Sequence, residues 1–189
     1  MHLLVAGQTP TIDDVVKAAD VSRRTIYMYF PTFDQLLLDA TAGALSTTTV
    51  DRAVAAESSD DAVRRVEHLA RAVSRHSASM LHLGRALIRL TIEANGPAGA
   101  EPRRGYRRME WIEKTLEPAR GRLGPARFER LVSALSVVIG WEAEIALRDV
   151  RGLNNEQVEE VVAWTARTLV ASALSDARRK TPSRTTRRP

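Results

Sequence analysis

The sequence predicts an all-α fold, and two patterns carry this prediction. Apolar residues recur at spacings of three and four along most of the 189 residues, whereas alternation of apolar and polar residues is nowhere sustained. Short stretches rich in Ser, Asp, Gly and Pro separate the apolar segments, and these residue types begin and end helices. With 44% hydrophobic and 27% charged residues, the chain has the composition of a globular protein with its own core.

The first 45 residues predict two short helices and a third, long one, each preceded by a Ser or Thr that can cap it. Thr11 is followed by Asp14 three residues later, which is a variant of the capping box. Pro31 ends the second helix because the residue before a proline disfavours helical conformation. The predicted helices cover residues 12–19, residues 23–30 after Ser22, and a longer segment after Thr32 with Phe33, Leu36, Leu37 and Ala40.

Longer helices are predicted for the rest of the chain, and the clearest loop between them is residues 95–102, NGPAGAEP. The predicted helices are one after residue 60 with Val63, Val66, Leu69 and Val73, one with Leu83, Leu87, Leu90 and Glu93, one beginning at Glu101 and Pro102 with Met109, Ile112 and Leu116, and two long ones over residues 126–150 and 155–178. These signals predict a helix-turn-helix domain over residues 1–45, a larger helical domain over residues 46–179 and a disordered basic tail over residues 180–189.

The composition excludes several kinds of site and location. The chain has no cysteine, so it forms neither a disulfide nor a thiolate metal site. No apolar run approaches the roughly 18 residues that a membrane span needs. Residues 1–14 lack the basic start and long apolar core of a secretory signal. We therefore expect a cytoplasmic protein that does not enter a membrane.

The net charge of +5 is unevenly distributed. Residues 1–45 carry three basic and five acidic residues, so the positive excess lies in the rest of the chain, much of it in the tail RRKTPSRTTRRP. A basic protein is typical of nucleic-acid partners, but this distribution supports such a partner only weakly. Two interpretations of the tail stay open, namely attraction to phosphates and a solvated, disordered end.

Residues 11–40, TIDDVVKAADVSRRTIYMYFPTFDQLLLDA, predict a helix-turn-helix. One face of the helix pair is expected to close a small core of Val15, Ala18, Ala19, Val21, Ile26 and Phe30. The other face of the second helix presents Arg23, Arg24, Thr25, Tyr27 and Tyr29. Arginines pair with guanine edges or phosphates and tyrosine hydroxyls reach phosphates, so this face suits duplex DNA. The alternative is an ordinary polar helix surface.

The same segment resembles the TetR family of transcriptional regulators. The family pattern joins a capped T-x-x-x-(I/V)-A helix, the turn A-G-V-S, a helix that ends L-Y-x-(H/Y)-F and a long helix with D-x-L-L. The matching segments of this chain are residues 11–16, 19–22, 26–30 and 34–37. Beyond residue 40 the resemblance is loose and rests mainly on Gly140-Trp141-Glu142 and the helix pair around it.

The resemblance implies a DNA-binding domain followed by a regulatory and dimerisation domain. By position, it implies base contacts from Arg23, Arg24 and Tyr27, and phosphate contacts from Thr11, Thr25 and Tyr29. It also implies a homodimer that places two recognition helices in successive major grooves of a pseudo-palindromic double-stranded DNA operator. An unidentified small-molecule effector in the larger domain would then weaken DNA binding.

Three departures from the family pattern bear on DNA binding. Asp20 stands where glycine is usual, and we expect the turn to survive because Asp tolerates the left-handed conformation. Phe33 stands where a phosphate-binding lysine is common, so we expect one anchoring contact to be lost. Of the family's first helix, this chain has only residues 1–5. A helix of five residues is too short to be stable, so we expect the natural chain to begin roughly ten to twenty residues earlier. The alternative is a natural truncation with weakened DNA binding.

The resemblance also implies that residues of the middle helices line the effector pocket. The candidates are Met80, His82, Tyr106, Trp111, Trp141 and Glu142. A buried Glu142 beside Trp141 would suit a cationic ligand. The alternative is that both tryptophans fill the core and that Glu142 is a satisfied polar group. The arginines around Tyr106 can either bind an anion or form a solvated basic face; they are Arg103, Arg104, Arg107 and Arg108.

The last two predicted helices are apolar over so much of their circumference that we expect burial on two sides. Small residues such as Ala163 and Ala166 let helices approach closely, which suits a bundle shared by two subunits. The expected interface residues are Leu135, Val162, Leu169 and Ala173. The alternative is burial wholly within one subunit.

No pattern in the chain predicts catalysis, a bound metal or a cofactor. The four histidines lack the H-E-x-x-H spacing, and neither a phosphate-cradling glycine loop nor a nucleophile elbow is present. The sequence thus predicts a non-enzymatic, ligand-responsive and sequence-specific DNA-binding regulator that represses transcription. The alternative is a helical ligand-binding or interaction protein whose DNA-binding motif is impaired.

Overall fold

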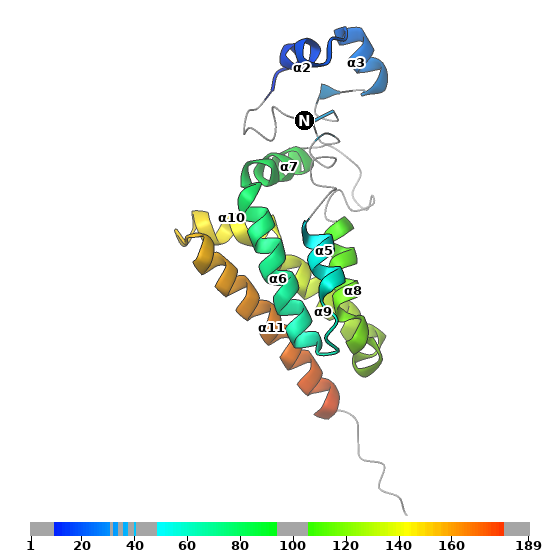
Figure 1. The fold of residues 1–189 in the computed structure, drawn as a ribbon, viewed down its shortest axis with the longest axis vertical. Helices are drawn as coiled ribbons and strands as arrows, with labels where there is room; N and C mark the ends of the chain where they lie inside the picture. The colour runs from blue at the N-terminus through cyan, green and yellow to red at the C-terminus, as the bar shows by residue number, and fades with distance from the viewer. Residues whose placement is uncertain are drawn as a thin grey trace, which may run out of the picture. The chain divides into compact units, whose positions relative to one another are not determined.

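The computed structural model describes residues 10–30, 32–33, 36–37, 40, 49–93 and 106–179. Every regular element in these ranges is an α-helix, so the predicted all-α class is confirmed for them (Figure 1). The helices are α2 (Ile12–Ala19), α3 (Arg23–Tyr29), α5 (Thr49–Ala56), α6 (Ala62–Ser79), α7 (Leu81–Glu93), α8 (Tyr106–Leu123), α9 (Pro125–Val138), α10 (Trp141–Asp149) and α11 (Asn155–Arg179). The predicted loop at residues 95–102, the start at residues 1–5 and the tail at residues 180–189 lie outside the described residues.

Residue contacts divide the chain into two units. The first comprises residues 1–48 and 77–104, and the second comprises residues 49–76 and 105–189. The sequence predicted a boundary at residue 45 and placed residues 77–104 in the larger domain, whereas contacts group α7 with the first unit. In this unit Leu37 and Leu83 are buried together, and Phe33, Ala40 and Met80 pack against them.

Helix α2 begins and ends as its sequence predicts. The Asp14 backbone N–H donates to Thr11 Oγ1 at 3.3 Å, and the Thr11 N–H donates to Asp14 Oδ2 at 2.7 Å, which completes a capping box. The bonds that the Thr11 backbone N–H and the Thr11 hydroxyl donate to the Asp14 carboxylate lower the pKa of that carboxyl. Asp20 ends the helix with φ 53° and ψ 44°, so the expected left-handed turn residue is confirmed. The Val21 N–H then donates to Val16 O at 3.3 Å, a bond that the left-handed residue makes possible.

The second unit has one hydrophobic core to which α5, α6, α8, α9 and α11 contribute. Figure 1 shows α6, α8, α9 and α11 as the long helices of this unit. Residues on the predicted apolar faces are buried, among them Val66, Leu69, Ile112, Leu116, Phe128 and Leu131. On α11 the buried positions recur every three or four residues, from Val158 to Ala177. Helix α5, which was not predicted, contributes Val50 and Val54 to this core.

The long helix predicted over residues 126–150 is two helices, and the prediction of one helix is wrong. Helix α9 ends at Val138, Ile139 is extended, and α10 begins at Trp141. Between them Gly140 has φ 142° and ψ −173°, a conformation that belongs essentially to glycine. The Arg108 side chain lies where a Cβ at position 140 would be. Its guanidinium donates to Ile139 O at 3.3 Å, which satisfies a carbonyl at the end of α9.

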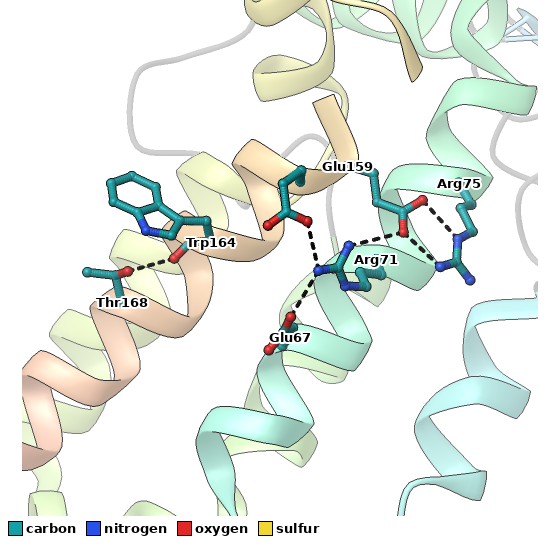
Figure 2. A network of polar contacts seen from close by, with 7 residues as sticks. Glu67, Arg71, Arg75, Glu159, Trp164 and Thr168 are labelled. Carbon is teal, nitrogen blue, oxygen red and sulfur yellow. Dashed lines mark hydrogen bonds and ion pairs between the residues drawn. The ribbon is translucent and has the colours of Figure 1, made fainter. Parts of the chain in front are cut away.

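A network of charged side chains joins α6 to α11, which lie far apart in the sequence (Figure 2). Arg71 donates to Glu67 at 3.0 Å, to Glu159 at 3.4 Å and to Glu160 at 2.9 Å. Arg75 forms two bonds with Glu159, at 2.9 and 2.7 Å. The bonds from Arg75, followed by those from Arg71, lower the pKa of Glu159. Because Glu159 is shared by two arginines and is largely buried, it is the member that holds the two helices together.

Replacing Glu159 with glutamine is expected to lower the free energy of unfolding at pH 7 by about 1–2 kcal/mol, since hydrogen bonds to charged groups are lost. The folded pKa of Glu159 is depressed, so its contribution is present above the unfolded pKa of about 4.3 and is lost as pH falls through the lower folded pKa. Urea unfolding between pH 7 and pH 3 measures this difference, which should shrink in acid. Glu156→Gln, an exposed position on the same helix, is the control. A pH-independent difference contradicts the prediction.

Candidate functional site

Helix α3 is a short helix whose side chains are almost all exposed. Ser22 caps it, because its Oγ accepts from the Thr25 N–H at 3.0 Å and lies 2.8 Å from Thr25 Oγ1. Ile26 is the buried residue of the helix, with 6% of its surface exposed. One buried side chain in seven residues leaves the rest of the helix available for contacts with another molecule.

The exposed surface of α3 combines cations with large apolar side chains. Arg23 and Arg24 lie exposed in its first turn. Tyr27, Met28 and Tyr29 follow with exposed fractions of 47%, 71% and 70%. Exposure of three consecutive large side chains to water is energetically unfavourable on a short helix. Such a surface is typical of a binding site. The two tyrosines were predicted to be exposed, whereas Met28, which lies opposite Ile26 on the helix, was not singled out.

The core between α2 and α3 is smaller than predicted. Val15, Val21 and Phe30 are half-buried around Ile26. Ala18 and Ala19, which were expected in this core, are exposed, and α2 contains no buried residue. The prediction for these two alanines is therefore wrong, since both lie exposed on α2.

Arg23 is held by a carboxylate of α2. Its Nε donates to Asp13 Oδ1 at 2.9 Å, and its Nη2 lies 2.6 Å from both Asp13 oxygens. The hydrogen bonds to Asp13 raise the pKa of the Arg23 guanidinium. Arg24, in contrast, makes no ion pair with any residue that the structure describes. The two predicted base-contacting arginines thus differ: one is preorganised by the chain and the other is unrestrained.

The predicted phosphate contacts also differ in how they are placed. Thr11 Oγ1 donates to Asp14 Oδ2 at 2.7 Å, and the Thr25 hydroxyl is bonded to Ser22, so both hydroxyls take part in helix caps. Tyr29 is well exposed. Phe33 packs against Leu37 and Leu83, so its ring contributes to the core of the first unit.

The six predicted pocket residues fall in two units. Met80 packs in the Leu37–Leu83 cluster and His82 is exposed, both in the first unit. Trp111 and Trp141 belong to the second unit, and the side chain of Tyr106 lies outside the described ones. The effector pocket stays a prediction.

Within the second unit, several polar atoms near these tryptophans are paired, whereas Trp141 Nε1 and Arg108 Nε are buried without a hydrogen-bond partner among the described residues. Trp111 Nε1 donates to Asp51 at 2.8 Å, and Arg107 donates to the same carboxylate at 2.6 Å. Arg108 binds Glu142 through two bonds, at 2.5 and 3.3 Å. Glu142 is thus bonded to a cation of its own chain, and two of the four predicted basic residues are in ion pairs. Arg103 and Arg104 lie outside the described residues.

The fully buried acid of this region is Glu144, which the sequence did not single out. It has 1% of its surface exposed. Ser74 of α6 donates to its Oε1 at 2.5 Å, and Arg148 donates to its Oε2 at 3.1 and 3.0 Å. The spacing of Glu144 and Arg148 by four residues on one helix was the available signal. Glu142 was chosen instead because it follows Trp141.

The predicted dimer residues are divided by burial. Leu135 and Val162 are 0% and 3% exposed in the core of one chain, which leaves them no surface for a second subunit. Leu169 and Ala173 are half-buried at the edge of that core. Apolar side chains that do face solvent on α9 and α11 are Val137, Val161 and Trp164, with exposed fractions of 68%, 37% and 54%.

No family model matches the chain, and searches of curated proteins and of solved structures likewise found no match. Among the described residues, no helix is long and apolar enough to cross a membrane. The same residues contain no group of three or more His, Cys, Asp or Glu side chains arranged to hold a metal ion.

Proposed function

We propose that this chain is a sequence-specific, ligand-responsive DNA-binding regulator that represses transcription. The observation that carries the proposal is the surface of α3, where two arginines and two tyrosines are exposed on a helix fixed by Ser22 and Ile26. Arginine reads guanine in the major groove through two parallel hydrogen bonds, and tyrosine hydroxyls reach phosphates. The left-handed turn at Asp20 connects α3 to α2 as a helix-turn-helix requires.

Replacing Arg24 with alanine is expected to weaken operator binding by about 1–3 kcal/mol and to relax the preference at one base pair, since an unrestrained arginine can reach a guanine edge. The operator is first selected from a random duplex library with the wild-type chain, and affinities are then measured by fluorescence anisotropy at several salt concentrations. Arg130→Ala removes one exposed positive charge from α9 and is the control.

Two results count against this function. Failure of the wild-type chain to enrich any duplex sequence would reject sequence-specific DNA binding. Wild-type affinity in both Arg23→Ala and Arg24→Ala would reject α3 as the recognition helix.

Two copies of the chain are needed to bind a pseudo-palindromic operator, and exposed apolar residues of α11 support such a dimer. Val161 and Trp164 are three residues apart and therefore lie on one face of the helix. Tryptophan exposed to this degree is typical of residues that anchor interfaces. Thr168 donates to the Trp164 carbonyl at 2.7 Å, so its hydroxyl is satisfied without a partner chain (Figure 2).

Replacing Trp164 with glutamate is expected to convert the dimer into a monomer that keeps its helical content, because loss of a central aromatic costs an interface about 2 kcal/mol or more. Sedimentation velocity at micromolar concentration measures the change. The control is Val150→Glu, which places the same charge at an exposed valine outside α9 and α11 and should leave the dimer intact. A wild-type chain that sediments as a monomer would contradict the dimer.

The regulatory step follows from the same arrangement. An effector that binds the larger domain changes operator affinity in proportion to its differential affinity for the DNA-competent and DNA-incompetent states. Operator affinity measured with and without candidate small molecules tests this step separately from DNA binding itself.

A second candidate is a helical interaction protein that no longer grips DNA. The observation that favours it is the engagement of Arg23 by Asp13, together with the loss of a cation at Phe33. This candidate predicts that duplex binding is weak and lacks sequence preference, so the duplex selection distinguishes the two.

A further inference from the structure

The contact between Asp13 and Arg23 connects the two helices of the helix-turn-helix. Asp13 lies in the first turn of α2 and Arg23 is the first residue of α3, ten residues later. The turn at Asp20 brings them together, and three hydrogen bonds of 2.6–2.9 Å join them. Both side chains remain in contact with solvent, with 59% of Arg23 and 66% of Asp13 exposed.

Such a pair does little for the stability of the fold. An ion pair exposed on both sides contributes little, because water screens the charges and two side chains lose freedom. The capping box of α2 and the buried Ile26 already fix the two helices. The geometry of the pair therefore matters more for what Arg23 presents outward than for folding.

The pair occupies one edge of the guanidinium and leaves another edge open. A guanidinium carries five N–H donors in a rigid plane. Asp13 takes the edge formed by Nε and Nη2, whereas Nη1 donates to no residue that the structure describes. The remaining edge, formed by Nη1 and the outer hydrogen of Nη2, has the spacing that matches guanine N7 and O6.

Two opposite consequences for DNA binding follow. Fixing the long arginine side chain before binding removes part of the rotamer entropy that it would otherwise lose, which favours the one base that fits. The negative charge of Asp13 near the phosphates at the same time weakens binding to every sequence. A carboxylate in this position thus lowers the affinity for every DNA sequence and raises the preference for the one base that fits Arg23.

We propose that Asp13 is a positioning residue for base recognition, which holds Arg23 by its Nε edge so that its outer edge reads one guanine in each half-site. This inference rests on the proposed function, because it requires that α3 contacts DNA. It adds a residue of α2 to those that determine which sequence is bound.

The test compares Asp13→Asn with Asp20→Asn in the whole chain. Both variants remove one negative charge from the helix-turn-helix, and asparagine tolerates the left-handed conformation of position 20. Affinities are measured for the selected operator, for operators with each guanine replaced in turn, and for a random duplex. Thermal unfolding of each variant confirms that the fold is retained.

Both variants are expected to bind the random duplex more tightly. Asp13→Asn alone should lose discrimination at one guanine, by about threefold to tenfold out of the roughly 5- to 160-fold that a bidentate contact provides. In an Arg23→Ala background, the same Asp13 substitution should change discrimination at that guanine no further. The Nε–H resonance of Arg23 should also shift in Asp13→Asn and not in Asp20→Asn.

Each contrary outcome has a distinct meaning. If Asp13→Asn binds the operator more tightly with discrimination unchanged, Asp13 is a competitor for Arg23 and the inference is overturned. If Arg23→Ala keeps discrimination at every guanine, the inference is overturned while Arg24 still supports the proposed function. If the wild-type chain prefers no duplex sequence, the proposed function fails and the inference fails with it.

Discussion

Replacement of Glu144 with alanine is expected to lower the free energy of unfolding of the second unit by about 3–5 kcal/mol, the largest effect of any substitution considered. Glu144 is 1% exposed and accepts bonds from Ser74 and from Nε and Nη2 of Arg148. Its removal leaves the Arg148 guanidinium, itself 17% exposed, with an uncompensated charge in the interior. Urea unfolding followed by circular dichroism measures the loss.

Two variants separate charge from packing at this position. Glu144→Gln keeps the acceptor for Ser74 but loses the charge that faces Arg148, so it should cost less than alanine. Arg148→Met in the Glu144→Gln background removes the unpaired cation and should recover part of the loss. A Glu144→Ala chain that loses less than 1 kcal/mol would show that the buried network does not hold α10 to α6.

Substitution of Gly140 with valine is expected to cost about 2–4 kcal/mol, because the backbone conformation is strained for any residue with a Cβ. The φ of 142° is one reason, and the Arg108 guanidinium in the space of the Cβ is the other. Displacing that guanidinium also breaks its bonds to Glu142 and to the Ile139 carbonyl. Urea unfolding again provides the measurement.

Gly121 offers a matched control for this prediction. It lies in the last turns of α8, is exposed, and has no atom within 4 Å of a Cβ built on it. Gly121→Ala should therefore stabilise the chain by up to about 1 kcal/mol, since glycine weakens helices. In an Arg108→Ala background, Gly140→Ala should cost less than in the wild type. If Gly140→Ala lowers the free energy of unfolding equally in both backgrounds, the steric overlap with Arg108 does not contribute to the loss.

Local signals predicted most helix ends correctly, and long-range contacts explain the main error. The beginnings of α2 after Thr11 and of α3 after Ser22 follow from the capping residue next to each helix. The break at Gly140 could not be predicted, because apolar spacing continues across it from Leu135 to Ala143. The side chain of Arg108, 32 positions earlier in the chain, lies where a Cβ at position 140 would be, and no local pattern indicates this contact.

The candidate site shows the same division between local and long-range information. The exposure of Arg24 and Tyr27 was predicted from their position on α3 opposite Ile26. The ion pair between Arg23 and Asp13 was not predicted, because it depends on the angle between two helices and not on residue spacing along one of them. Helical periodicity likewise identified Leu135 and Val162 as buried. It did not distinguish burial in the chain's own core from burial in an interface with a second subunit.

The position of α11 at the end of the second unit has a kinetic consequence. This helix supplies seven buried residues, from Val158 to Ala177, to a core whose other members begin at Val50. It also carries the glutamates that pair with Arg71 and Arg75. During synthesis, α5 and α6 therefore leave the ribosome long before α11 is made, and their apolar faces are not covered by it until then. Contacts so distant in sequence slow folding, so the second unit should depend on its final helix for timely folding as well as for stability.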